Sequence, residues 1–442
     1  MSYSDYVLTP GQRTGRLSLA MAWWALFSAM FWLYIAVASA QTVGITNTII
    51  GMALTIATYG AINAVLSRYG ARTGLTVELF SRSLFGVLGS ALATLIFAAT
   101  AIYYAVFEGA IIAAAFHSYF GGNLKLWYAL VVLYALPLVA GGVQNWLDRL
   151  NGWLLPVYSI GIVAAVIATA AHHGSGIAWP HGGSTGMPGW LSSYLIYMGV
   201  YIMMMYTFDY ARFGRAEDEG FHASVTFGWV FYLLTFGLNG LIGIYLVSAW
   251  GVAGTETGVV DAMIKSLGFG GLLVILVSQT RINSANYYLA SSNLDALATR
   301  LFRLVLPRWV FVIVAGVIAY LLMLTDVLSY LLKALAWQGV FVTAWVGIAL
   351  VYIALARPTS EVLPEVRRDR LQPVAAGAVV WVLASGVGIW LTQQTAYPRL
   401  AELAPLITLA LSAGGYAAVA RVAPPAVLPS AEQVHVAEQQ MA

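Results

Sequence analysis

Hydrophobic residues recur along this chain in stretches of about twenty, separated by short polar connections. A helix needs roughly twenty mostly apolar residues to cross about 30 Å of hydrocarbon. A membrane β-barrel would instead show alternating polarity over about ten residues, and runs such as 160–168 do not alternate. The pattern therefore predicts an all-α membrane protein of about twelve transmembrane helices, near residues 18–40, 46–67, 87–116, 125–143, 152–171, 192–211, 225–250, 269–295, 305–324, 327–355, 373–393 and 400–420.

Composition supports lipid as the main solvent of the chain. Hydrophobic residues make up 60% and charged residues 9%, whereas about a quarter of an ordinary soluble domain is charged. The polar start up to Arg16 runs into a full-length span, so no cleavable signal is expected. The chain contains no cysteine, which excludes disulfides and thiolate chemistry.

Basic residues are distributed unequally between the two sides of the predicted spans. The side shared by the termini carries Arg13, Arg16, Arg68, Arg72, Arg82, Arg149, Arg212, Arg215, Arg300, Arg303, Arg308, Arg357, Arg367, Arg368, Arg370 and Arg421. The other side carries Lys125, Lys265 and Arg399. This asymmetry predicts a multi-pass protein of the plasma membrane with both termini cytoplasmic. Because topology accounts for the positive charge, no nucleic-acid partner is expected.

Three ionisable residues, Glu108, Arg281 and Lys333, fall inside or at the edge of predicted spans. Such a group costs at least about 2.5–3.5 kcal/mol at the centre of a bilayer, so each needs a partner or a wet cavity. Glu108 is a functional candidate, or else a buried carboxyl that ties two helices together. Arg281 is a second candidate, or a structural cation that satisfies helix-end carbonyls. For Lys333, extension of the side chain to the interface is the favoured interpretation.

The eighth span carries an unusual polar run from Ser278 to Asn286. The spacing of four and three places Gln279, Asn283 and Asn286 on one helical face, where they could bind a single ligand. The alternative is hydrogen bonding between helices, which is common in membranes.

Tyr104 lies one turn before Glu108 on the same face of the third span. A flat ring could stack on Tyr104 while Glu108 accepts its N–H donors. Because burial favours the neutral form of a carboxyl, Glu108 is also the first candidate to carry a transported proton. The histidines lack metal-ligand spacing, so neither a metal nor a cofactor is expected.

Two segments carry a resemblance to a known family. The loop 70–76, with Ser81-Arg82 and the run 85–90, is similar to the nucleobase-cation symporter family, cytosine/purine permease branch. The segment 209–215, Asp-Tyr-Ala-Arg-Phe-Gly-Arg, resembles the Asp-x-x-Arg-Phe-Gly-Arg signature of that family. Together with the number of spans, the resemblance covers the chain to about residue 420.

The resemblance implies two inverted repeats of five helices, two accessory helices, and alternating access around a substrate held where the first and sixth helices are unwound. With the arginine distribution and the proline-rich tail, the expected divisions are a cytoplasmic N-terminus 1–17, a transport core 18–356 with repeats at about 18–171 and 192–356, a cytoplasmic loop 357–372, accessory helices 373–420, and a disordered cytoplasmic tail 421–442.

The family's substrate contacts match particular residues of this sequence. An aromatic residue on the third span and a polar residue one turn later correspond to Tyr104 and Glu108. Sixth-span contacts fall near Tyr201, and eighth-span contacts fall near Gln279, Asn283 and Asn286.

The sequence departs from the family at the sodium site. Sodium-coupled members place a Ser/Thr pair on the eighth span, and here Thr280 and Arg281 take those positions. A fixed positive charge disfavours sodium, so we expect proton-coupled transport or uniport. The carboxylate of Glu108 widens the substrate field to purines, cytosine-like pyrimidines, and cationic or amidine-like compounds.

An importer of small nitrogenous ring compounds is the function that these features favour. A channel would need a ring of like residues around a continuous pore. A membrane enzyme would need a nucleophile, a base and an orienting group, or a metal cluster, and the sequence shows no such set. A transporter-like sensor stays an alternative. The exact substrate, the coupling ion and the oligomeric state stay open.

Overall fold

The protein was analysed as a computed structural model, which describes residues 7–8, 10–140, 148–176, 186–325, 331–355 and 372–422. The main helices are α1 (Arg16–Trp23), α2 (Phe31–Val43), α3 (Ile45–Thr73), α4 (Val77–Phe120), α5 (Leu124–Ala140), α6 (Asp148–His173), α7 (Gly189–Met198), α8 (Ile202–Ala211), α11 (Asn239–Trp250), α12 (Glu256–Leu267), α13 (Phe269–Phe302), α14 (Arg308–Met323), α15 (Leu331–Leu355), α16 (Ala376–Thr392) and α17 (Pro398–Val422). Short helical segments, including α9 (Glu219–Phe221) and α10 (Trp229–Tyr232), connect α8 to α11.

These helices make the protein an all-helical membrane protein, as the apolar pattern predicts. Among the described residues, six helices are long and apolar enough to cross a membrane, and two bent pairs form broken spans. The pairs are residues 16–28 with 31–43, bent by 45°, and residues 189–198 with 202–211, bent by 46°. Three shorter apolar helices, α5, α14 and α16, lie where single spans were expected.

Two local predictions were wrong. The helix α12 lies in a stretch that was expected to be a connection. Helix α3 continues to Thr73, into the predicted loop 70–76, and α4 begins at Val77 rather than near residue 87. The side chain of Thr76 caps this early start by accepting the backbone N–H of Leu79 at 3.0 Å, which satisfies one of the free donors of the first turn.

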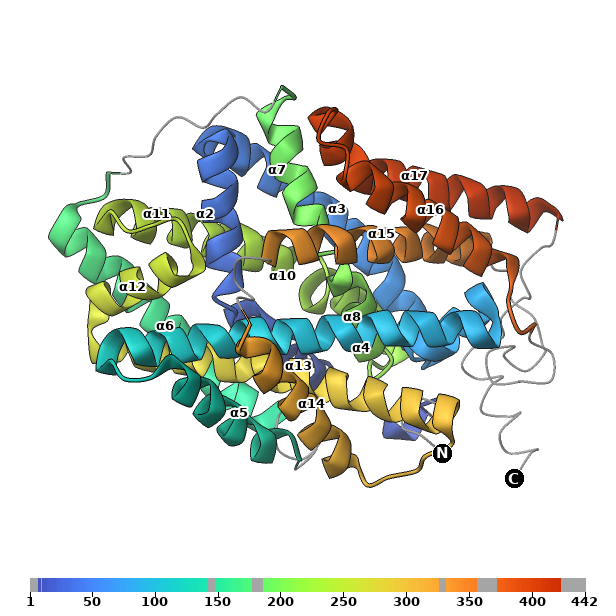
Figure 1. Ribbon diagram of the computed structural model, residues 1–442, viewed down its shortest axis with the longest axis horizontal. Helices are drawn as coiled ribbons and strands as arrows, with labels where there is room; N and C mark the ends of the chain where they lie inside the picture. The colour runs from blue at the N-terminus through green and yellow to red at the C-terminus, as the bar shows by residue number, and fades with distance from the viewer. Residues whose placement is uncertain are drawn as a thin grey trace.

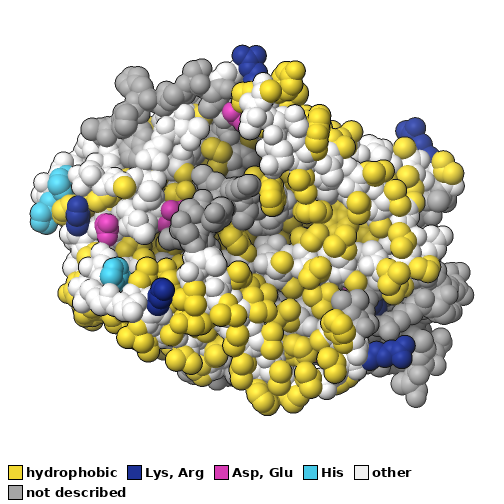
Figure 2. All heavy atoms as spheres, in the orientation of Figure 1, with side chains coloured by type: hydrophobic (Ala, Val, Ile, Leu, Met, Phe, Trp, Pro, Cys, Tyr) yellow, Lys and Arg dark blue, Asp and Glu magenta, His cyan; other side chains and the backbone are white. Residues whose placement is uncertain are grey.

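Helices α4 and α13 pack along each other through the middle of the molecule, and α3 packs against both α7 and α8 (Figure 1). Helices α16 and α17 lie side by side at one edge and contact α15. Hydrophobic side chains dominate the lower half of the face shown in Figure 2, and charged side chains are scattered. Such a surface fits contact with lipid.

Helix α4 is kinked at Gly86, whose φ of 77° is a conformation that favours glycine. The N–H groups of the next two residues donate to the carbonyls of Gln372 and Pro373, at 3.1 and 2.8 Å. The N–H of Ala375 donates back to the carbonyl of Phe85 at 3.0 Å. The chain entering α16 is therefore joined to α4 through the main chain.

Candidate substrate-binding site

The first broken helix leaves backbone groups without helical partners between α1 and α2. The segment 24–30, Trp-Ala-Leu-Phe-Ser-Ala-Met, contains neither glycine nor proline. In a membrane, such groups must find partners within the protein, since no water replaces them. The residues around the break supply those partners.

Five side chains from outside this segment form hydrogen bonds with its backbone. They are Arg281 (Nη2 to the Trp24 carbonyl, 2.9 Å), Trp32 (Nε1 to the Leu26 carbonyl, 2.6 Å), Asn239 (Nδ2 to the Phe27 carbonyl, 2.7 Å), Ser278 (Oγ to the Ser28 carbonyl) and Gln279 (Oε1 from the Met30 N–H, 3.1 Å). Three of these five side chains lie on α13. The polar run of the eighth span therefore holds the first helix in its broken form.

Glu108 lies beside this break and is almost fully buried, with 1% of its surface exposed. The side-chain N–H group of Gln279 donates to the Glu108 carboxylate and, at 3.4 Å, to its backbone carbonyl. Since Gln279 also accepts from Met30, one amide links the carboxylate to the helix break. Arg281 directs a donor to Trp24, so the hydrogen bond that Glu108 accepts comes from a neutral amide.

Tyr104 lies one turn before Glu108 on α4, at the same level as the start of α2. Its ring packs edge-on against Phe31, the first residue of α2, with centroids 6.0 Å apart and planes at 88°. Its hydroxyl makes no hydrogen bond of normal geometry within the described part of the chain. Tyr104, Glu108 and Gln279 thus gather around the first break.

Sequence reasoning missed Gln338, which lies on α15. Its amide interacts with the Tyr104 hydroxyl, yet neither amide atom makes a well-formed hydrogen bond to a described residue. The next residue, Gly339, packs on the second helix break, where an added Cβ would come within 2.9 Å of the Gly199 Cα. Gln338 therefore presents a donor and an acceptor at the level of both breaks.

The second broken helix separates α7 from α8, and Tyr201 lies at this break as expected. Its ring packs edge-on against Tyr59 of α3, with centroids 5.1 Å apart. Its hydroxyl lies 3.5 Å from that of Tyr194. The Tyr59 hydroxyl in turn donates to the Tyr197 carbonyl at 2.5 Å. The structure thus places the Tyr201 ring against α3.

The other residues of the eighth-span cluster face different neighbours. The Thr280 hydroxyl lies 2.5 Å from that of Tyr134 on α5, so the structure does not bring Thr280 to the helix break with Arg281. Asn283 lies near Gly109, with Nδ2 3.6 Å from the place of a Cβ there. Asn286 is buried, and its Nδ2 has no partner among the described residues. Gln279 alone of the three predicted amides contacts Glu108 through a hydrogen bond of the described structure.

Lys333 lies on α15, and its side chain is outside the described residues. Within the ranges described, no group of three His, Asp or Glu side chains is arranged to hold a metal ion.

The protein has the LeuT fold, which it shares over nearly its whole length with solved membrane transporters. Mhp1, a nucleobase-cation-symport-1 family transporter solved in a closed conformation with bromovinylhydantoin bound, has this fold, with a TM-score of 0.75, 17% identity, and coverage of 98% of this chain and 99% of that one. An inward-facing conformation of Mhp1 gives a TM-score of 0.74 at 17% identity, covering 96% of this chain and 94% of the other.

More distant structures share the fold as well. A Na⁺-coupled sialic acid symporter has a TM-score of 0.62 at 15% identity, covering 97% of this chain and 93% of its own. A manganese transporter of Eremococcus coleocola gives 0.61 at 13% identity, covering 96% and 99%. No family model and no curated relative matches the sequence. At these identities, the comparisons show the fold.

Proposed function

We propose that the protein is a secondary transporter that imports a nucleobase or a related small nitrogenous heterocycle by alternating access, without sodium. The observation that carries the proposal is that the first helix break is contacted both by Gln279, which donates to the Glu108 carboxylate, and by Arg281, which donates to the Trp24 carbonyl. The fold shared with Mhp1 supports transport, and the site chemistry supports the substrate class.

The first helix break supports sodium independence. Carbonyls at the C-terminal end of a helix attract cations, and half-helix ends of this kind coordinate sodium in transporters. Here the Arg281 guanidinium already donates to the Trp24 carbonyl, just past the end of α1. A sodium ion about 4 Å from that charge would be repelled by about 4 kcal/mol at an effective dielectric constant of 20. This corresponds to about a thousandfold loss of affinity.

Substrate recognition follows from three side chains around the site. Tyr104 offers an aromatic face, and Glu108 accepts strongly from N–H groups. The Gln338 amide presents one donor and one acceptor, and both atoms lack a well-formed hydrogen bond to a described residue. A ring that carries an N–H next to a C=O complements such an amide. In the proposed complex, the adjacent N–H and C=O groups of the ring bond to Gln338, and the remaining N–H groups of the ring donate to Glu108.

Either proton coupling or uniport is compatible with this site. For proton coupling, Glu108 is the proposed carrier, because its carboxyl is buried and its hydrogen-bond partner is neutral. The proposed orientation has both termini in the cytoplasm of a plasma-membrane protein, on the basis of the arginine distribution.

A second candidate substrate is a small cationic or amidine-like compound. The observation that favours it is again Glu108, since a buried carboxylate bonded to a neutral amide can form a charge-assisted pair with a bound cation.

Thermal unfolding of the detergent-purified protein tests both candidates. Cytosine, adenine, hydantoin and benzamidinium are added in sodium or potassium chloride to the wild type, Glu108→Gln and the control Glu217→Gln, whose side chain is 73% exposed. We expect one compound to raise the unfolding temperature equally in both salts for wild type and control, but not for Glu108→Gln. Stabilisation that requires sodium, or normal binding by Glu108→Gln, would contradict the proposal.

A further inference from the structure

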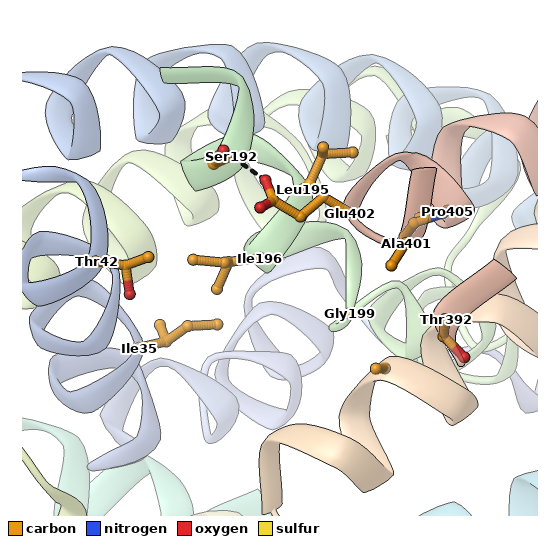
Figure 3. A pocket seen from close by; sticks show the side chains of 11 residues that line it. Ile35, Thr42, Ser192, Leu195, Ile196, Gly199, Thr392, Ala401, Glu402 and Pro405 are labelled. Atoms are coloured by element: carbon orange, nitrogen blue, oxygen red, sulfur yellow. Dashed lines mark hydrogen bonds between the residues drawn. The ribbon is translucent and has the colours of Figure 1, made fainter. Parts of the chain in front are cut away.

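A cavity of about 310 Å³ lies apart from the Glu108 site, between one half of each broken helix and the C-terminal helices (Figure 3). Its walls come from α2, α7, α15, α16 and α17. The volume is at the low end of the range for pockets that hold small molecules. The cavity is therefore large enough for a single small ring compound.

The cavity reaches the second helix break and the start of the described part of α15, close to the proposed substrate site. One lining residue is Gly199, at the break between α7 and α8, and another is Ala336, two residues before Gln338. The lining also includes Glu402, near the start of α17, and Thr42, near the end of α2. The cavity thus extends from the second break toward the membrane side on which α2 ends and α7 begins. The arginine distribution assigns that side to the exterior.

The chemistry of the cavity selects for positive or N–H-rich ligands. Among the described residues that line it, Glu402 is the one ionisable side chain. Figure 3 shows the Glu402 carboxylate facing Ser192 across the cavity wall, and the Ser192 hydroxyl donates to Oε2 at 2.8 Å. Apolar groups such as Ile35 and Ile196 surround this pair. A carboxylate with apolar walls attracts cations and N–H donors and repels anions.

We propose that this cavity is an entrance site, which holds a small planar cation or N–H-rich ring before it moves to Glu108. This inference rests on the proposed function and narrows it, because two carboxylates in series disfavour any substrate that carries a negative charge. The ring packs on the aliphatic wall, and its N–H groups bond to Glu402. The Ser192 hydroxyl holds the carboxylate in place.

The competing interpretation is that the bond from Ser192 to Glu402 only ties α7 to α17. The two interpretations differ in what they need from Glu402. A binding site needs its negative charge, which Glu402→Gln removes while keeping an oxygen that accepts from Ser192. A structural tie needs the hydrogen bond, which Ser192→Ala removes while leaving the charge.

Because the native chain contains no cysteine, a single introduced cysteine reports on the cavity without background. Thr392→Cys places a thiol in the lining, and Ser175→Cys is the control in the exposed loop after α6, on the same membrane side. Both are made in the Glu108→Gln protein, so the central site does not contribute. The measured quantity is the ratio of modification rates by a cationic and an anionic methanethiosulfonate reagent, with and without benzamidinium.

We expect this ratio to be about tenfold higher at position 392 than at position 175, as in clefts lined by one sign of charge. Benzamidinium should slow modification at position 392 alone. Adding Glu402→Gln should remove both effects, whereas adding Ser192→Ala should keep them. Absence of protection by benzamidinium, or equal loss in the Ser192→Ala and Glu402→Gln proteins, would overturn the proposal.

This result is separable from that of the proposed function, since no step of the labelling requires transport. Protection at position 392 without uptake or Glu108-dependent binding in the wild type would leave the entrance site standing and remove the transport assignment. Uptake without protection at position 392 would support the transport assignment and remove the entrance site.

Discussion

Exchanging potassium for sodium as the only cation is expected to leave the thermal stability of the wild-type protein unchanged. The reason is the guanidinium of Arg281, which is fully buried and donates to the Trp24 carbonyl at 2.9 Å. Repulsion of about 4 kcal/mol at about 4 Å removes about three orders of magnitude of sodium affinity. A site of millimolar affinity would then have a dissociation constant of about 1 M and would be mostly empty at about 0.1 M sodium.

The substitution Arg281→Ser removes this charge and leaves the Trp24 carbonyl with the Phe27 N–H, 3.3 Å away, as its donor. Loss of the hydrogen bond from the charged guanidinium should destabilise the protein in potassium by about 1.5–3 kcal/mol. Sodium should then restore up to about 2.7 kcal/mol if its concentration reaches a hundred times the dissociation constant. The control Arg215→Ser changes an arginine that is 51% exposed and should respond to neither salt.

The assay is the unfolding temperature of each purified variant in matched sodium and potassium chloride, read from intrinsic tryptophan fluorescence. Sodium stabilisation of the wild type would refute the reasoning, because it would show that the ion binds despite the guanidinium. Equal stability of Arg281→Ser and the wild type in potassium would show that the bond to Trp24 contributes nothing.

Three further predictions concern other parts of the molecule. Gln338→Leu should weaken binding of a ring with adjacent N–H and C=O groups by roughly tenfold, the value of about one hydrogen bond, as measured by ligand-induced stabilisation; unchanged affinity would remove Gln338 from the site. Gly86→Ala should lower the unfolding temperature, because a positive φ costs a non-glycine residue about 1–2 kcal/mol and the new Cβ would lie 2.5 Å from the Gln372 carbonyl oxygen. The control Gly386→Ala adds a Cβ with no atom within 4 Å and should leave the unfolding temperature unchanged. Burial raises the pKa of Glu256 above 4.5, so the folded state binds its proton more tightly and stability should fall as pH rises above that value, a slope that Glu256→Gln should flatten in pH-dependent unfolding.

The membrane-spanning architecture was predictable because it depends on a simple physical requirement. Apolar stretches long enough to cross a bilayer mark the helices, and the broken spans still read as single apolar segments. The helix α12 was missed because its twelve residues are too few to span and its apolar positions alternate with Glu256, Asp261 and Lys265.

The positions of the helix breaks could not be read from the residues that form them. The segment 24–30 has no glycine or proline, and its conformation depends on side chains from α11 and α13 that are more than 200 positions away in the chain. Only the resemblance to a family indicated that the first helix is unwound. Sequence patterns report local preference, and this break is stabilised by tertiary contacts.

The candidate site was partly accessible from sequence. Glu108 and Arg281 were identified because charged groups are costly in lipid, and the structure places both beside the first break. Gln338 gave no such signal, since an isolated amide near the start of a span is unremarkable in composition. Its relevance depends on the packing of Gly339 against Gly199, which is a long-range contact.

The main-chain junction at Gly86 bears on which parts of the molecule move as one body. The carbonyls of Gln372 and Pro373 accept the first two N–H groups after Gly86, at the start of the section of α4 that leads to Glu108. The chain entering α16 is therefore bonded to the same helix that carries the carboxylate. Any motion that displaces the Gly86 end of this section of α4 would therefore carry the start of α16 with it, or break three backbone hydrogen bonds. If the proposed transport involves tilting of the broken helices, α16 should stay with α4 during that motion, and a distance probe between α16 and α8 would measure the tilt.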